Sequence, residues 1–142
     1  MNRKISMAGI AGAPPQIDPV FLNSPVLKDT SLDRSLGCQL VAKDETQNPV
    51  GSFKGRGTEL FAATALTPGQ TVVCASAGNF GQGLARAAAR RGHACVVFAA
   101  ENANPMKIAT SANSTVSPRL SFSIMPAELR AAIAARPVTA TS

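Results

Sequence analysis

Lys54 is the residue whose surroundings in the sequence most favour covalent chemistry. It lies in segment 48–57, Asn-Pro-Val-Gly-Ser-Phe-Lys-Gly-Arg-Gly, where Ser52 is expected to cap a helix. The start of a helix carries a partial positive charge, which disfavours an ammonium and favours the neutral amine that condenses with carbonyl compounds. Gly55 and Gly57 would each cost a helix about 1 kcal/mol, which indicates that something approaches this backbone closely. An ordinary surface lysine in a flexible loop is the competing interpretation.

A second segment, 76–83, has the composition of an anion site. It reads Ser-Ala-Gly-Asn-Phe-Gly-Gln-Gly and follows an apolar run. Where a helix begins directly after a strand, its first N–H groups are free to bind a carboxylate or a phosphate. Ser76, Asn79 and Gln82 add polar side chains. A tight turn without a ligand is the alternative, although three glycines exceed what a turn requires.

The same segment permits a dinucleotide-binding interpretation. Gly78, Gly81 and Gly83 follow a run typical of a strand, and the acidic Glu101 ends the next such run, as in Rossmann-like units. The spacing is not Gly-x-Gly-x-x-Gly, and a unit that begins at residue 71 leaves everything before it unexplained. These departures count against dinucleotide binding without excluding it.

The pattern of apolar residues around segment 76–83 predicts an α/β fold. The runs at 71–76 and 93–100 are typical of buried strands in a parallel sheet. An alanine-rich helix is expected between them at 84–91, with Gly92 at its end. Strand, glycine-rich turn, helix and strand form one βαβ unit with parallel strands.

The preceding part of the chain is predicted to hold less regular structure and one long helix. Residues 1–23 are rich in Pro, Gly and Ala and are expected to form an irregular N-terminal arm. A capped turn or short helix is expected within 24–37, and a short strand within 38–46, where apolar and polar residues alternate. Segment 52–66 is predicted to be a helix.

Composition restricts the classes of function. The chain has 142 residues, 45% hydrophobic and 15% charged, which fits one domain with a packed core. Its net charge is +6, but the basic residues are scattered without interleaved aromatic residues, so no nucleic-acid partner is expected. No apolar run reaches the roughly 18 residues of a membrane span, so no membrane partner is expected. Cys38, Cys74 and Cys95 lack metal-ligand spacing, and an odd number of cysteines suits the cytoplasm.

Taken together, the two segments resemble the fold type II pyridoxal-phosphate (PLP) enzymes, most closely the threonine/serine dehydratases. That family has Gly-Ser-Phe-Lys before Arg-Gly, matched here by residues 51–57, and a Ser-x-Gly-Asn-x-x-Gln loop, matched by 76–82. Residues 43–49 are similar to the family's Lys-x-Glu-x-x-x-Pro approach to the lysine, and 104–107 to its Pro-x-x-Lys or Pro-x-Lys start of a helix. The resemblance covers about residues 24–108 and implies an incomplete tryptophan synthase beta-like PLP fold.

The resemblance also implies a role for each candidate residue. Lys54 would hold PLP covalently and would then remove the α-proton of the substrate, and Phe53 would lie against the cofactor. Asn79 would donate a hydrogen bond to the hydroxyl group of the pyridine ring. The implied reaction is β-elimination of water from serine or threonine, an ammonia-lyase reaction on a small amino acid. The substrate carboxylate site would be lined by Ser76, Ala77, Gly78 and Gln82.

Two positions depart from the family pattern inside the second segment. Phe80 stands where the family often has His, so the substrate preference stays open. Ala77 stands where the serine racemases of eukaryotes carry a serine as second base, which argues against racemisation.

The largest departure concerns length. Family members are far longer, are usually homo-oligomers, and hold the cofactor phosphate with a later glycine-rich loop that has no counterpart here. Residues 109–142 are rich in Ser and Thr, show no strand pattern, and are expected to be a divergent, poorly ordered tail after a truncation or frameshift near residue 108. Without that loop the chain is expected to bind PLP weakly. Three classes therefore stay open: a PLP lyase domain impaired by truncation, a dinucleotide-binding protein, and a non-catalytic remnant.

Overall fold

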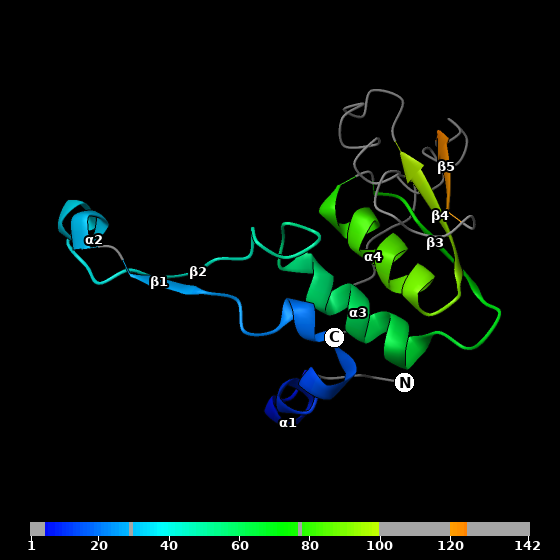
Figure 1. The fold of residues 1–142 in the computed structure, drawn as a ribbon, viewed down its shortest axis with the longest axis horizontal. Coiled ribbons are helices and arrows are strands. Elements are labelled where there is room, and N and C mark those ends of the chain that lie inside the picture. Colours follow the sequence, from blue (N-terminus) through cyan, green and yellow to red (C-terminus); the bar gives the residue numbers. More distant parts are fainter. Residues whose placement is uncertain (1–4, 29, 77, 100–119, 125–142) are drawn as a thin grey trace, which may run out of the picture.

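The computed structural model describes residues 5–28, 30–76, 78–99 and 120–124. Two helices, α3 and α4, lie side by side, and α4 lies between α3 and a three-stranded sheet (Figure 1). The elements in chain order are α1 (Met7–Ala11), the 3-10 turns η1 (Pro14–Gln16) and η2 (Pro19–Phe21), β1 (Val26–Lys28), α2 (Thr30–Leu36), β2 (Val41–Lys43), α3 (Lys54–Ala65), β3 (Thr71–Cys74), α4 (Asn79–Arg90), β4 (Ala94–Ala99) and β5 (Leu120–Ile124).

The predicted parallel βαβ unit is confirmed. β3 pairs in parallel with β4, with Val72 opposite Cys95, and α4 connects the two strands. β4 pairs in parallel with β5 on its other edge, so the strand order is β3-β4-β5. The expectation that residues 109–142 contain no strand is therefore wrong. β5 reads Leu-Ser-Phe-Ser-Ile, a period-2 alternation that its serine-rich surroundings obscure.

The larger core lies between α4 and one face of the sheet. Leu84, Ala85 and Ala88 of α4 pack against Val72, Cys95 and Val97 of the strands. Alanine allows the helix to approach the sheet closely, and the sequence keeps its arginines on other faces of α4.

The strands β3 and β4 are buried on one face only, which corrects the prediction of fully buried strands. Along β4 the residues alternate between buried and half-buried, and along β3 only Val72 is buried. Val73, which points away from Val72, is exposed. The apolar runs therefore reflect high β-propensity as well as burial.

Helix α4 begins at Asn79, inside the stretch that the sequence predicted to be a glycine-rich turn. Gly81 and Gly83 are helical residues, and close packing explains both. A Cβ atom on Gly81 would lie 1.8 Å from the carbonyl oxygen of Ser76, and one on Gly83 would lie 2.8 Å from Thr58 Oγ1. Gly92, at φ 76°, ends the helix as predicted.

Helix α3 begins two residues later than predicted, and its N-cap is Phe53 rather than Ser52. Phe53 has helical backbone angles and makes no side-chain capping bond. Ser52 Oγ instead accepts the N–H of Lys54 at 3.3 Å. The Gly55 backbone is approached by the ring of Phe21, since a Cβ there would lie 2.2 Å from that ring, whereas Gly57 faces open space.

The N-terminal arm, predicted to be irregular, consists largely of short helical turns. Ser6 Oγ caps α1 by accepting the N–H of Gly9, and Asp18 caps η2 by accepting the N–H of Val20. Phe21 from this arm is almost fully buried in a second core cluster, with Ala13, Ile17 and Val50.

The β1–β2 hairpin and α2 extend away from the two long helices (Figure 1). β1 and β2 are antiparallel, with Leu27 opposite Ala42. These elements agree with the short helix expected within 24–37 and the short strand expected within 38–46. In the described residues, no helix has the length and apolarity needed to cross a membrane.

Candidate functional site

The loop that precedes Lys54 is organised by the side chain of Asn48. Asn48 Oδ1 accepts the N–H of Val50 at 3.0 Å and that of Ser52 at 3.4 Å. Its Nδ2 donates to the carbonyl oxygens of Glu45 at 2.8 Å and Ser52 at 3.1 Å. Gly51 adopts φ 59°, which the turn requires and which a residue with a side chain adopts only with strain. One asparagine thus replaces the backbone hydrogen bonds that a helix or sheet would supply.

A carboxylate and a guanidinium connect this loop to the start of α3. Arg56 Nη2 donates to Glu45 Oε1 at 2.5 Å and to Ser24 Oγ at 2.7 Å. Arg56 Nε donates to the carbonyl oxygen of Phe21 at 2.7 Å. Glu45 Oε2 accepts from Ser24 at 3.0 Å and from Asn48 at 3.3 Å. The ion pair therefore joins the arm, the loop and the first turn of α3.

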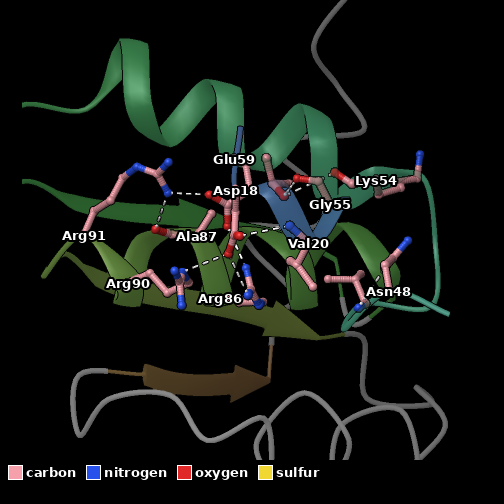
Figure 2. A network of polar contacts seen from close by, with 12 residues as sticks. Asp18, Val20, Asn48, Lys54, Gly55, Glu59, Arg86, Ala87, Arg90 and Arg91 are labelled. Atoms are coloured by element: carbon pink, nitrogen blue, oxygen red, sulfur yellow. Dashed lines mark hydrogen bonds and ion pairs between the residues drawn. The ribbon is translucent and has the colours of Figure 1, made fainter. Parts of the chain in front are cut away.

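Lys54 is the first residue of α3, and its side chain is exposed. Its Nζ lies 4.9 Å from the centre of the Phe53 ring, a cation–π distance. Figure 2 shows Lys54 at the far side of the view from Arg91, with its amine directed away from the ion pairs around Asp18. The amine is thus accessible to a ligand, while its backbone is held by the loop.

The start of α4 presents backbone N–H groups after β3. Gly78 is the N-cap, and the N–H of Gln82 makes the first helical bond, to the Gly78 carbonyl at 3.1 Å. The N–H groups before Gln82 in a helix have no acceptor within it. Asn79 is exposed, and Ser76 and Gln82 are half-buried. Ala77, predicted to line the substrate site, lies outside the described residues.

The structure brings the first turns of α3 and α4 together. The Thr58 hydroxyl donates toward the carbonyls of Lys54 and Gly55, at 3.2 and 3.0 Å. The same hydroxyl lies against Gly83, where a Cβ would be only 2.8 Å away. Figure 1 shows the two helices beginning at the same end of the pair. The lysine and the predicted anion-binding turn therefore belong to one end of the helix pair.

An ion-pair network joins the other faces of the two helices to the N-terminal arm (Figure 2). Glu59 of α3, only 1% exposed, pairs with Arg86 at 2.9 Å and with Arg91 at 2.6 Å. Asp18 of the arm pairs with Arg86 at 2.9 Å and with Arg90 at 3.2 Å. Sequence reasoning missed this network because Asp18 and Arg86 are far apart in the chain.

Partial burial by itself would raise the pKa of Asp18, but hydrogen bonds and nearby positive charges together lower this pKa by more. The N–H of Val20 and the guanidinium groups of Arg86 and Arg90 hold the pKa of Asp18 below its ordinary value of 3.8. Burial prevails at the two core thiols, since it raises the pKa of Cys95 to about 12 and the pKa of Cys74 in the same direction. Burial thus disfavours the reactive thiolate at both cysteines.

A groove of about 700 Å³ lies between the N-terminal arm and α3. Its lining includes Ile10, Ile17 and Leu60, and also Arg56 of the candidate site, but not Lys54, so the groove borders the site without containing the lysine. Within the described part of the chain, no cluster of His, Cys, Asp and Glu could hold a metal ion.

Three residues that support the site were not assigned roles from the sequence. Asn48, Thr58 and Glu45 act through hydrogen bonds to backbone or to arginine. An Asn-Pro turn is a known signal for side-chain capping of a loop. Of the three roles, that of Asn48 was therefore the easiest to predict from the sequence. Thr58 and Glu45 acquire theirs only when distant segments meet.

A family model described as "Pyridoxal-phosphate dependent enzyme" matches residues 17–115 of the chain. The chain belongs to this family. The match begins before and ends after the range of about 24–108 that the sequence motifs suggested. The predicted membership of the PLP-enzyme family and the predicted α/β fold class are confirmed, and members of the family bind PLP.

The relatives and solved structures bear several reaction names. Threonine synthase of Mycobacterium tuberculosis (strain H37Rv) is 43% identical over 76 residues, 53% of this chain and 21% of the relative. A threonine deaminase structure from T.th. superposes with a TM-score of 0.68 at 29% identity, covering 91% of this chain and 39% of that one. Maize serine racemase gives a TM-score of 0.74 at 26% identity, covering 92% and 40%. The chain thus spans about a fifth of that synthase and about two fifths of those structures.

The residues present fit the chemistry that PLP requires of its lysine. An exposed amine begins α3, an aromatic ring lies beside it, and helix α4 begins at the same end with N–H groups suited to an anion. The family assignment therefore favours the PLP-enzyme interpretation over dinucleotide binding.

Proposed function

We propose that this chain is the lysine-bearing part of a PLP-dependent amino-acid ammonia-lyase that removes water from serine or threonine. The observation that carries the proposal is the exposed Lys54 at the start of α3, at the end of the helix pair where α4 also begins, in a chain of the PLP family. The threonine deaminase structure, at 29% identity over most of the chain, supports elimination as the reaction. Because the synthase and racemase relatives carry out other reactions by name, the reaction type is what experiment must test.

In this proposal Lys54 is both the residue that attaches the cofactor and the base. Its exposed amine would bond to PLP, with Phe53 beside the ring and Asn79 donating to the ring hydroxyl. When bound, PLP supplies an electron sink for the α-carbon of an amino acid. Lys54 Nζ would accept the α-proton, and the β-hydroxyl would gain a proton as it leaves, so that the group departs as water.

The substrate carboxylate is assigned to the start of α4. The N–H groups after Gly78 and the half-buried side chains of Ser76 and Gln82 offer donors at a helix N-terminus. Ala77 belongs to the same assignment through its place in the motif. A small amino acid is therefore the proposed substrate.

Borohydride trapping tests the cofactor assignment. The chain is mixed with PLP, reduced, digested and examined by mass spectrometry, with Lys54→Ala as the control. We expect the label on Lys54 and its loss in the variant. Label spread evenly over the surface lysines would contradict the assignment, and stabilisation by NAD rather than PLP would favour a dinucleotide-binding protein.

The reaction is tested by product analysis with serine and threonine. Release of ammonia with the corresponding 2-oxo acid supports the lyase, whereas accumulation of the D-amino acid would indicate racemisation. A chain that is labelled at Lys54 but turns over neither amino acid would support the non-catalytic remnant.

A further inference from the structure

We infer that the Glu45–Arg56 ion pair is a positioning device for Lys54, and that neither residue acts on the cofactor directly. This inference rests on the proposed function for its importance, although one of the two readouts in its test does not use PLP. The pair joins the residue nine positions before Lys54 to the residue two positions after it, so the reactive lysine lies inside the segment that the pair closes.

The clamp, defined as Glu45, Asn48 and Arg56, forms a continuous set of hydrogen bonds. Both carboxylate oxygens of Glu45 are engaged, Oε1 by Arg56 at 2.5 Å and Oε2 by Asn48 at 3.3 Å. Asn48 connects Glu45 to the residues before Lys54, because its Nδ2 donates to the carbonyl of Ser52 at 3.1 Å. Ser52 Oγ in turn accepts the N–H of Lys54. Each step is one hydrogen bond, and the last one ends on the lysine backbone.

Arg56 anchors the clamp to the packed part of the molecule. Its Nε donates to the carbonyl of Phe21 at 2.7 Å. Phe21 is 1% exposed and its ring lies against Gly55, the residue directly after Lys54. The guanidinium therefore holds the loop against the buried ring that also limits movement of the Lys54–Gly55 backbone.

The Asp18–Arg86–Glu59 network meets the anchor of the clamp at Phe21, whose ring centre lies 4.9 Å from the Arg86 guanidinium, but it takes no part in the hydrogen bonds that lead from Glu45 to Lys54. Glu45 and Asp18 are carboxylates of similar exposure, 15% and 13%; Glu45 pairs with Arg56, and Asp18 pairs with Arg86 and Arg90. Only Glu45 connects through Asn48 and Ser52 to Lys54. Glu45→Gln and Asp18→Asn thus remove the same charge from similar environments, and only the first lies on the path to the lysine.

The test compares Lys54 reactivity in the full chain of the wild type, Glu45→Gln, Arg56→Lys and the control Asp18→Asn. Trace acetylation from about pH 7 to about pH 11, a range that spans the ordinary lysine pKa, is read by mass spectrometry with Lys28 as internal reference. PLP trapping is read in parallel. We expect Glu45→Gln to lower the PLP labelling of Lys54 by about tenfold or more and to change its acetylation profile relative to Lys28. Asp18→Asn should leave both within about twofold.

Arg56→Lys keeps the positive charge but loses the forked donors, so we expect an intermediate effect. Unchanged Lys54 profiles in folded Glu45→Gln, or an equal change in Asp18→Asn, would overturn the inference. Circular dichroism establishes that each variant is folded. If the wild type is not labelled by PLP, the proposed function fails, and the acetylation profiles still decide the clamp.

Discussion

Two regions of the molecule differ in how far their apolar residues are buried. The first region consists of α3, α4 and β3–β4, and the second consists of β1, α2 and β2. In the first, Leu84 and Val97 are almost fully buried. In the second, Val26, Leu27 and Val41 are between 51% and 61% exposed. A two-stranded hairpin without a covered face is marginal in water. The first region is therefore stabilised by burial, and the second chiefly by local hydrogen bonds.

The polar contacts show the same contrast. Leu40 N–H donates to Asp33 at 2.6 Å, and Asp44 accepts from Thr46 and Gln47, all within short stretches of sequence. In the helix pair, Arg86 bridges Asp18 and Glu59 across 68 and 27 residues. Long-range contacts form only when the whole region folds, so we expect the helix pair to unfold cooperatively and the hairpin to open locally.

The strongest test of the contrast is Glu59→Ala. Removing the carboxylate leaves the partly buried guanidiniums of Arg86 and Arg91 without their shared partner, and we expect a loss of about 3–5 kcal/mol in the free energy of unfolding. Chemical denaturation measures it, with Leu27→Ala in the hairpin as control. A loss no greater than the control's would mean that the network contributes little.

Gly81→Ala should have the next largest effect. The new Cβ would meet the carbonyl oxygen of Ser76, a backbone atom that cannot turn aside, and we expect a loss of about 1–3 kcal/mol. Gly57→Ala is the matched control in α3, where the Cβ meets nothing within 4 Å and helix propensity favours alanine. Equal stability of the two variants would show that α4 can shift away from Ser76.

The pH dependence of stability should separate the two regions further. Because the folded-state pKa of Asp18 is lowered, its stabilisation is complete above its ordinary value of 3.8 and is lost as the pH falls below that value. Asp18→Asn should flatten the acid limb of a melting-temperature profile. The pKa of Asp44, in the loop after β2, is also lowered, by hydrogen bonds from Thr46 and Gln47. These partners are local and uncharged, whereas those of Asp18 include two guanidinium groups, so Asp44→Asn should flatten the profile less. The reverse order would contradict the contrast.

The smallest effect is expected in the hairpin region. Val41→Thr changes an exposed residue of β2 and should alter the free energy of unfolding by no more than about 0.5 kcal/mol.

Hydrogen exchange should be faster in β1 and β2 than in β3 and β4. Protection of the hairpin equal to that of β4 would show that local hydrogen bonds suffice to stabilise it.

Local patterns predicted the elements that depend on local physics. A parallel βαβ unit could be predicted from three local signals: the β-branched run at β3, the alanine stripe of α4 and Gly92. Local signals are sufficient here because periodicity and helix termination are properties of neighbouring residues. The predicted start of helix α4 was wrong because close packing, and not the local sequence pattern, accounts for the glycines there. Gly81 and Gly83 resemble turn residues in sequence, but they belong to α4, at positions where Ser76 and Thr58 leave no room for a side chain.

The order and types of residues by themselves determined the motifs, the family resemblance and the identity of Lys54 as the candidate reactive residue. Only the tertiary structure decided what holds that lysine in place. Glu45, Arg56 and Phe21 lie on separate segments, and no short-range pattern relates them. The physical reason is that a hydrogen bond depends on distances of about 3 Å in space, and chain folding sets those distances independently of separation along the sequence.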